Sequence, residues 1–287
     1  MTARLELPLA YLDTLWLQVT GTFCNIACRH CFVSAGPKVD LHRMMSVDQV
    51  TRALDDGLAA GLRSVWFTGG EPFLHPEIVP LVDLALAHAP LGILTNATLI
   101  DDPLAEALGE RFRTGPYTLE IRVSLDGRTP ETNDRVRGRG VFAAACDGIR
   151  RLAAHGVEPI VAVSALDDLS GDQAAFADLL RSLGVTRPRV KWIPPFRIGR
   201  EAGRRGGRAY HAWEVLTAED IAVPDAPHRL QCGTSRCVTA EGVYACPILV
   251  NEPGFRMGDH LGDALRPHPV DHRACHTCWA EAFSCSV

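Results

Sequence analysis

The sequence lacks long hydrophobic runs: among its 287 residues no apolar stretch approaches the roughly 18 that a membrane span requires. The first residues lack the apolar core of a secretory signal peptide. A basic excess is also missing, because the net charge is −5 and the pI is about 6.1, which offers no electrostatic footprint for nucleic acid. We therefore expect a cytoplasmic protein with neither membrane nor nucleic-acid partners.

Lysine is scarce, with two residues, whereas cysteine is abundant, with ten. In a small secreted chain, so many cysteines would indicate disulfide bonds. In a longer chain without a signal peptide they indicate metal binding instead. The length allows one barrel-sized domain with a small appendage, and it is sufficient to bury a large core.

Three cysteines near the N-terminus have the spacing C-x₃-C-x₂-C: Cys24, Cys28 and Cys31. They follow an apolar run at 13–20 that predicts a buried strand. Thiolates hold iron–sulfur clusters, and three of them leave one corner of a four-iron cluster for an outside ligand. An open metal position is typical of a reactive site. The alternative is a zinc knuckle that His30 or a distant cysteine completes.

A second segment combines glycine with an acidic residue and a proline. A short apolar strand at 64–67 is followed by Gly69, Gly70, Glu71 and Pro72. Paired glycines let the backbone approach a ligand closely. Glu71 supplies an acceptor on a turn that Pro72 stiffens. The alternative is an ordinary turn between a strand and a helix.

Predicted strands and helices alternate along the first two thirds of the chain. The strands are expected at 13–20, 64–67, 91–96, 119–127, 159–164 and 190–193, and the helices at 46–60, 76–88, 101–112, 141–155 and 173–183. Ser46 can cap the first helix. Six strand–helix units in series predict an α/β fold in which outer helices cover a parallel sheet. Six strands are too few for a closed eight-stranded barrel.

The cysteine triplet and residues 69–72 together resemble the radical S-adenosylmethionine (SAM) superfamily. The resemblance implies a (β/α)6 partial TIM barrel whose site lies at the carboxyl ends of the strands. It implies that Cys24, Cys28 and Cys31 hold a [4Fe–4S] cluster whose fourth iron binds SAM. It also implies that Gly69, Gly70, Glu71 and Pro72 line the SAM amino group.

Further cofactor contacts are expected at the ends of later strands. Asn96 ends the third predicted strand, and we expect it to be one of the residues that bind the cofactor. By similarity to maturases of the superfamily, Ser124 and Arg137 hold the ribose and carboxylate of SAM, and the guanidinium fork suits a carboxylate. Two positions depart from the family: Asn133 stands where histidine is common, and His30 stands where an aromatic residue often faces the adenine.

The composition changes after the sixth strand. Residues 197–208 are rich in Arg and Gly and predict either a lid that meets an anionic substrate or a solvated connector. A short helix is expected over 213–220 and a linker at 224–227. We therefore divide the chain into a partial barrel, 1–221, and a small Cys-rich domain with a β-hairpin and a helix, 222–287.

Six cysteines lie beyond that boundary. Residues 232–247 predict a hairpin with Gly242 at the turn, and a C-x₂-C pair follows. On spacing alone a structural zinc site is the alternative. The segment resembles the SPASM and twitch extensions of radical SAM enzymes, which hold auxiliary [4Fe–4S] clusters. The resemblance implies one cluster and four ligands: Cys232, Cys246, Cys275 and Cys278. Cys237 and Cys285 are then spare, or one of them replaces a member of the set, and Cys146 is expected to be a buried core thiol.

The resemblance implies a reaction as well as a fold. An external one-electron donor such as flavodoxin or ferredoxin reduces the first cluster, and SAM is cleaved to methionine and a 5′-deoxyadenosyl radical that takes a hydrogen atom from the substrate. The auxiliary cluster would then accept an electron, which makes the enzyme an oxidoreductase. Alternatively, Cys237 or Cys285 would return a hydrogen atom, which makes it an epimerase.

The substrate class is expected from the start of the chain. The first strand begins almost at once, with no room for an N-terminal peptide-recognition domain, so we expect a small molecule of the secondary-metabolite type. Modification of a ribosomally made peptide is the alternative. A zinc-stabilised binding module without enzymatic activity is the alternative from another functional class.

Overall fold

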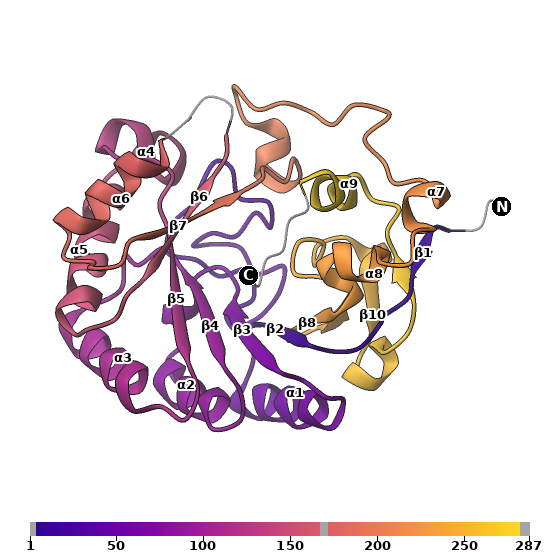
Figure 1. The fold of residues 1–287 in the computed structure, drawn as a ribbon, viewed down its shortest axis with the longest axis horizontal. Helices are drawn as coiled ribbons and strands as arrows, with labels where there is room; N and C mark the ends of the chain where they lie inside the picture. Colours follow the sequence, from indigo (N-terminus) through magenta and orange to yellow (C-terminus); the bar gives the residue numbers. More distant parts are fainter. Residues whose placement is uncertain (1–3, 167–171, 282–287) are drawn as a thin grey trace.

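The computed structural model describes residues 4–166 and 172–281, and a nine-stranded sheet forms its centre (Figure 1). The strands in spatial order are β10 (Arg256–Gly258), β9 (Gly242–Tyr244), β8 (Ser235–Thr239), β2 (Thr14–Gln18), β3 (Ser64–Thr68), β4 (Leu91–Thr95), β5 (Leu119–Ser124), β6 (Ile160–Ser164) and β7 (Arg189–Ile193). From β2 to β7 all neighbours are parallel. These are the six predicted strands, so the expected α/β architecture is confirmed.

Helices follow the strands and form an outer arc around the sheet (Figure 1). They are α1 (Val47–Ala59), α2 (Ile78–Leu86), α3 (Asp102–Thr114), α4 (Pro130–Arg137), α5 (Val141–Ala154) and α6 (Gln173–Ser182). Ser46 caps α1 as predicted, because its side chain accepts from the Gln49 N–H and the Gln49 side chain accepts from the Ser46 N–H. These helices cover one face of the sheet and leave the other for the site (Figure 1).

Alternation along β2 separates these two faces. Leu15 and Leu17 belong to the core that packs against the helices, whereas Trp16 belongs to a second apolar cluster inside the barrel. Trp16 stacks on Trp66 with ring centroids 5.2 Å apart. Gly92 leaves room for this pair, since a Cβ there would lie 2.3 Å from the Trp66 ring. The stacked rings of Trp16 and Trp66 therefore fill part of the barrel interior.

The C-terminal segment joins the same sheet. β8 lies parallel to β2, and β9 returns antiparallel to β8, as the predicted hairpin requires (Figure 1). Gly242 has φ +131° and begins β9 directly after the turn. β1 (Glu6–Leu7) pairs with β11 (His268–Pro269) and ties the start of the chain to its end. The division near residue 222 stays a prediction, with one sheet running across it.

Several short elements differ from expectation. α4 was not predicted, because its eight residues contain one apolar side chain besides the proline. The helix expected over 213–220 is wrong: α7 (Ala218–Ile221) is shorter, because the Glu214 carboxylate accepts from the His211 N–H at 2.6 Å and from Arg197 at 2.8 Å. α8 begins inside the expected linker. The remaining helices are α8 (Ala226–Arg229) and α9 (Arg273–Ala280), with 3₁₀ turns at η1 (Pro72–Leu74), η2 (Gly199–Gly203), η3 (Gln231–Gly233), η4 (Pro253–Phe255) and η5 (Leu261–Ala264).

Within residues 4–166 and 172–281 no helix combines the length and the apolar character needed to cross a bilayer.

Candidate active site

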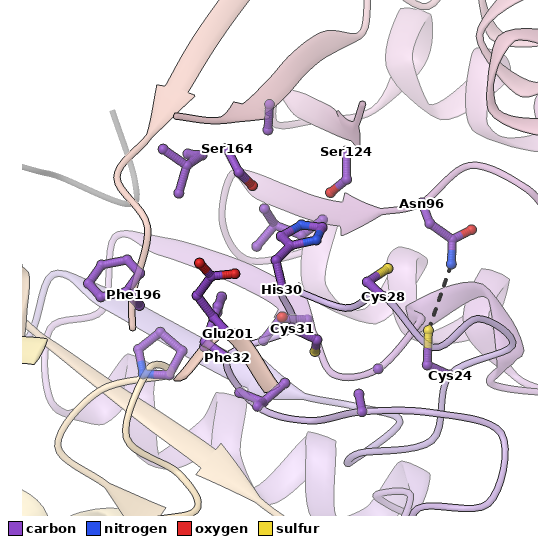
Figure 2. Close-up of a pocket in the computed structure, with 18 of the residues that line it drawn as sticks. Cys24, Cys28, His30, Cys31, Phe32, Asn96, Ser124, Ser164, Phe196 and Glu201 are labelled. Atoms are coloured by element: carbon purple, nitrogen blue, oxygen red, sulfur yellow. Dashed lines mark hydrogen bonds between the residues drawn. The ribbon is translucent and has the colours of Figure 1, made fainter. Parts of the chain in front are cut away.

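A cavity of about 230 Å³ opens at the carboxyl ends of the parallel strands. This is the end of the sheet where α/β barrels bind their ligands. Residues from six strands and from the loops that follow them line it. They include Trp16, Gln18, Cys24, Cys28, His30, Cys31, Gly69, Gly70, Asn96, Ser124, Arg137, Ser164, Phe196 and Glu201 (Figure 2).

The loop after β2 brings the cysteine triplet into this cavity (Figure 2). Cys24 and Cys28 are buried and Cys31 is half-buried, and Asn96 Nδ2 donates to Cys24 Sγ at 3.8 Å. Burial raises the pKa of Cys24 to about 12 and that of Cys28 to about 11, so as free thiols they stay protonated at neutral pH. Thiols that bind metal are deprotonated by it. Buried, inert thiols that line one cavity therefore fit an iron–sulfur cluster.

His30 does not complete a zinc knuckle with these cysteines. Its Nε2 lies 3.0 Å from an Asp126 oxygen. In the described part of the chain, no three His, Cys, Asp or Glu side chains form a group that could hold a single metal ion. A four-iron cluster has a different requirement, because each thiolate binds its own iron.

The paired glycines bring the turn after β3 against the cysteine loop. A Cβ on Gly70 would lie 2.0 Å from the Phe23 carbonyl oxygen, and Gly69 has φ +142°. The Glu71 N–H donates to the same Phe23 oxygen at 3.1 Å. Only glycine permits this approach, and both glycines also line the cavity.

Glu71 is fully buried, and its carboxylate is bound by the protein itself. It accepts from Thr95 Oγ1 and the Asn96 N–H at 2.7 Å each, and from the Phe73 N–H at 3.2 Å. Burial raises the pKa of Glu71 to about 7 against the effect of these bonds. Glu71 and Pro72 are not among the residues that line the cavity. Glu71 thus fixes the end of β4 and positions Asn96, while its expected contact with SAM stays a prediction.

Asp126 connects three parts of the site. One carboxylate oxygen lies 2.7 Å from Arg137 Nε and 3.0 Å from His30 Nε2, and the other accepts from the Ser164 N–H at 2.7 Å. Burial alone would raise the pKa of Asp126, but Arg137 and His30 outweigh it and hold this pKa well below its usual range. From the sequence, Asp126 is only one residue of the strand predicted at 119–127, with no role of its own. The available signal was a carboxylate shortly after the apolar strand β5.

The Arg-rich segment after β7 closes one side of the cavity (Figure 2). Arg200 donates to the carbonyls of Cys28 at 2.7 Å and Ser34 at 2.9 Å, and its N–H donates to the Cys31 carbonyl at 3.0 Å. Arg197 pairs with Glu214, and Arg204 pairs with Glu201. These three arginines are bound by protein partners, so the solvated connector does not describe them. The segment borders the cavity as a lid would, and its contact with an anionic substrate stays a prediction.

A second, smaller cavity of about 30 Å³ lies beside the first. The four cysteines predicted for an auxiliary cluster all line it: Cys232, Cys246, Cys275 and Cys278. The structure brings this set together, and its role as a ligand set stays a prediction. Pro247 and Ile248 line both cavities, so these two residues form the wall between the first cavity and the second.

The remaining cysteines have different positions. Cys237 is fully buried in the interior cluster with Trp16 and lines neither cavity. Cys146 is buried on α5 in the core that faces the helices, as predicted. Cys285 lies outside the described residues. The catalytic role expected for Cys237 and Cys285 stays a prediction.

An arginine lies beside the second cysteine group. Arg236 on β8 is fully buried and donates to the carbonyls of Cys232, Ala264 and Arg266 at 2.7, 2.8 and 2.9 Å. Its Nη2 also lies 3.3 Å from His268 Nδ1. Burial lowers the pKa of Arg236 to about 10, which leaves the guanidinium charged at neutral pH.

We expect acid to destabilise the fold through His268. Burial, and then the charge of Arg236, lower the pKa of His268 from 6.5 to about 3. At a pH between about 3 and 6.5 the His268 ring is protonated in the unfolded chain but neutral in the folded chain. The neutral ring therefore contributes its full stability above pH 6.5, and this stability is lost progressively as the pH falls below 6.5. The loss is about 1.4 kcal/mol per pH unit, or about 2 kcal/mol at pH 5. Denaturant unfolding at pH 7 and pH 5 measures it.

The variant His268→Gln is the matched control, because its amide oxygen can accept from Arg236 without titrating. The wild-type chain should lose about 2 kcal/mol more than the variant between pH 7 and pH 5. Equal losses in the two proteins would contradict the prediction.

Comparison with known sequences identifies relatives of the chain. A family model described as the radical SAM superfamily matches residues 19–167. AlbA of Bacillus subtilis, a protein of biosynthesis of the antilisterial bacteriocin subtilosin, is 29% identical over 62% of this chain and 39% of AlbA. The mycofactocin maturase MftC of Mycobacterium ulcerans is 29% identical over 84% of this chain and 69% of MftC. The chain thus spans well under half of AlbA and about two thirds of MftC.

Solved structures share the fold at low sequence identity. Streptococcus suis SuiB bound to the precursor peptide SuiA superposes with a TM-score of 0.64 and 14% identity, covering 89% of this chain and 63% of SuiB. A structure of anSMEcpe with bound AdoMet gives 0.63 and 16%, covering 92% of this chain and 82% of anSMEcpe. The likeness confirms the predicted fold class.

Proposed function

The chain belongs to the radical SAM superfamily, and we propose that it modifies a peptide by removing hydrogen from an unactivated carbon. It is an enzyme of a family that uses a [4Fe–4S] cluster and SAM. The observation that carries the proposal is the single cavity into which the three cysteines, both glycines of the turn and the polar strand ends open.

Different residues around the cavity bind the cluster, position the cysteine loop and exclude water. Cys24, Cys28 and Cys31 hold the cluster, and when bound the cluster and SAM supply the 5′-deoxyadenosyl radical. Arg200 holds the cysteine loop in place through its backbone carbonyls. The lid and the buried strand ends exclude water, which protects a reactive radical from side reactions.

The cofactor's polar groups need separate partners. Ser124 and Arg137 bind the ribose and carboxylate of SAM, and Asp126 orients Arg137 through their 2.7 Å contact. Gly69 and Gly70 let the backbone approach the SAM amino group, and Asn96 contacts the cluster cysteine Cys24 at 3.8 Å.

The relatives favour a peptide substrate over the small molecule that we expected. AlbA is named for the biosynthesis of a bacteriocin, and SuiB binds a precursor peptide. Another structure of anSMEcpe holds the Cp18Cys peptide together with AdoMet. The small-molecule expectation depended on where the sequence begins, and the relatives outweigh it. The apolar wall at Phe32, Pro195, Phe196 and Ile248 suits a peptide side chain.

We further propose that the second cysteine group holds an auxiliary [4Fe–4S] cluster. An outside donor supplies the electron that cleaves SAM. The auxiliary cluster would be held by Cys232, Cys246, Cys275 and Cys278. When bound, it would supply an acceptor for the electron that the peptide must lose after one hydrogen atom has gone to the 5′-deoxyadenosyl radical and a proton to solvent. We propose net oxidation, since among the described residues Cys237 lines neither cavity and is poorly placed to return a hydrogen atom; Cys285 lies outside those residues.

Anaerobically reconstituted protein tests the proposal. Two clusters require about eight irons per chain. With dithionite, SAM and synthetic copies of short peptides encoded beside the gene, we expect 5′-deoxyadenosine and a peptide lighter by two hydrogen atoms in mass spectrometry. Cleavage of SAM without any change in peptide mass would contradict the proposed net oxidation of that peptide. Zinc without iron would contradict the radical chemistry.

A further inference from the structure

Arg236 is a buried cation without an anionic partner. Its side chain is inaccessible to solvent, and every acceptor that it contacts is neutral. These acceptors are the carbonyls of Cys232, Ser235, Ala264 and Arg266 and the His268 ring. Across residues 4–166 and 172–281, no carboxylate forms an ion pair with this guanidinium.

Such an arrangement is costly unless another charge is present. Carbonyl oxygens orient a guanidinium but carry no net charge to balance it. His268 cannot help, because its Nδ1 accepts from Arg236 and burial keeps the ring neutral. Other buried arginines of the chain follow the usual rule: Arg137 faces Asp126, and Arg204 faces Glu201. Arg236 is therefore an exception that needs an anion.

The nearest candidates for that anion are the thiols of the second cavity. Arg236 Nη1 donates to the Cys232 carbonyl at 2.7 Å, and the negative charges of Cys232 and Cys246 as thiolates favour its charged form. Both cysteines line the 30 Å³ cavity with Cys275 and Cys278. Four thiolates outnumber the positive charge of an oxidised four-iron core, so the assembly is anionic and becomes more so when reduced.

We propose that Arg236 is the buried counter-charge of the auxiliary cluster and raises its reduction potential. The inference rests on the proposed function, because it requires a cluster at this cysteine group. A fixed positive charge in a dry environment stabilises the reduced, more negative form more than the oxidised form. The cluster is then easier to reduce, which is what an acceptor of the substrate electron needs.

The test isolates the auxiliary cluster in the full-length chain. Cys24→Ala, Cys28→Ala and Cys31→Ala together remove the first cluster, so one cluster remains to be titrated by electron paramagnetic resonance. Into this background we place Arg236→Gln, which removes the charge, and Arg236→Lys, which keeps it. Arg266→Gln is the matched control, because Arg266 is exposed and also donates to backbone carbonyls.

We expect Arg236→Gln to lower the equilibrium constant for reduction at least tenfold, which is about 59 mV in a one-electron couple. Arg236→Lys and Arg266→Gln should stay close to the parent. A loaded Arg236→Gln variant with the parent's potential would overturn the inference. If the cluster is lost from both Arg236 variants, the guanidinium acts through its shape and the inference also fails, whereas loss from Arg236→Gln alone supports it.

Iron analysis separates this inference from the function on which it rests. A parent background without iron contradicts the auxiliary cluster itself and removes the counter-charge role with it. Iron in the parent with unchanged potentials in the variants contradicts only the role of Arg236.

Discussion

Replacing Cys24 by alanine is expected to reduce the formation of 5′-deoxyadenosine from SAM by roughly a thousandfold or more, which is about 4 kcal/mol in activation free energy. The cavity at the strand ends presents three thiols, and Cys24 is the one that Asn96 contacts. Two thiolates cannot retain a four-iron cluster in the form that leaves a single iron open. Chromatography of reduced protein incubated with SAM measures the product.

Cys146→Ala is the matched control for this loss. Cys146 is buried to a similar degree, but it lies on α5 in the core between sheet and helices, away from both cavities. Its replacement removes one small apolar group from the core and should leave SAM cleavage intact. If Cys24→Ala keeps its iron and its activity, the assignment of the triplet is wrong.

The central fold could be predicted because its signals are local. The strands β2, β3, β4 and β6 are short apolar runs with a polar residue at the end, and five helices have apolar faces of helical spacing. Parallel strands need crossovers, so alternation of the two element types implies a parallel sheet, whereas its sequential order came from the family resemblance. The cysteine triplet and the glycine turn lie at the ends of two such strands, and their meeting at one edge of the sheet follows from that geometry.

Other features depend on contacts between residues distant in the sequence. β8 pairs with β2 more than 200 residues earlier, and neither strand carries a mark of this pairing. Arg200 belongs to a basic segment that resembles a surface loop, and only the fold shows its guanidinium on the Cys28 carbonyl. Glu71 was identified from its motif, but its partners Thr95 and Asn96 come from another strand.

The two arginines beside the cysteine loops illustrate the limit of motif reasoning. Arg200 and Arg236 each donate to the carbonyl of a predicted cluster ligand, Cys28 or Cys232. A motif records which residues bind the metal, whereas the charge around the metal depends on side chains that reach it from other segments. The metal ligands can be predicted from the spacing of cysteines, whereas the side chains that set the charge around the metal are found only in the structure.

The second large effect is expected on stability, from replacing Asp126 by asparagine. Asp126 is buried, and the change leaves the buried charge of Arg137 without its partner at 2.7 Å. Removal of one member of a buried ion pair costs about 3–5 kcal/mol, because the other charge remains desolvated. Urea unfolding of the cluster-loaded chain, under argon and at neutral pH, measures the change in the free energy of unfolding.

Two comparisons show whether the loss comes from an uncompensated charge. Asp83→Asn removes a partner of Arg111 at 2.6 Å, but this pair is at the surface, so its loss should stay below about 1 kcal/mol. The double variant Asp126→Asn with Arg137→Met removes both buried charges and should be more stable than Asp126→Asn alone. A double variant less stable than the single one would mean that Asp126 stabilises the fold through His30 and the Ser164 backbone, independently of Arg137. Recovery would instead identify the uncompensated buried charge of Arg137 as the source of the loss.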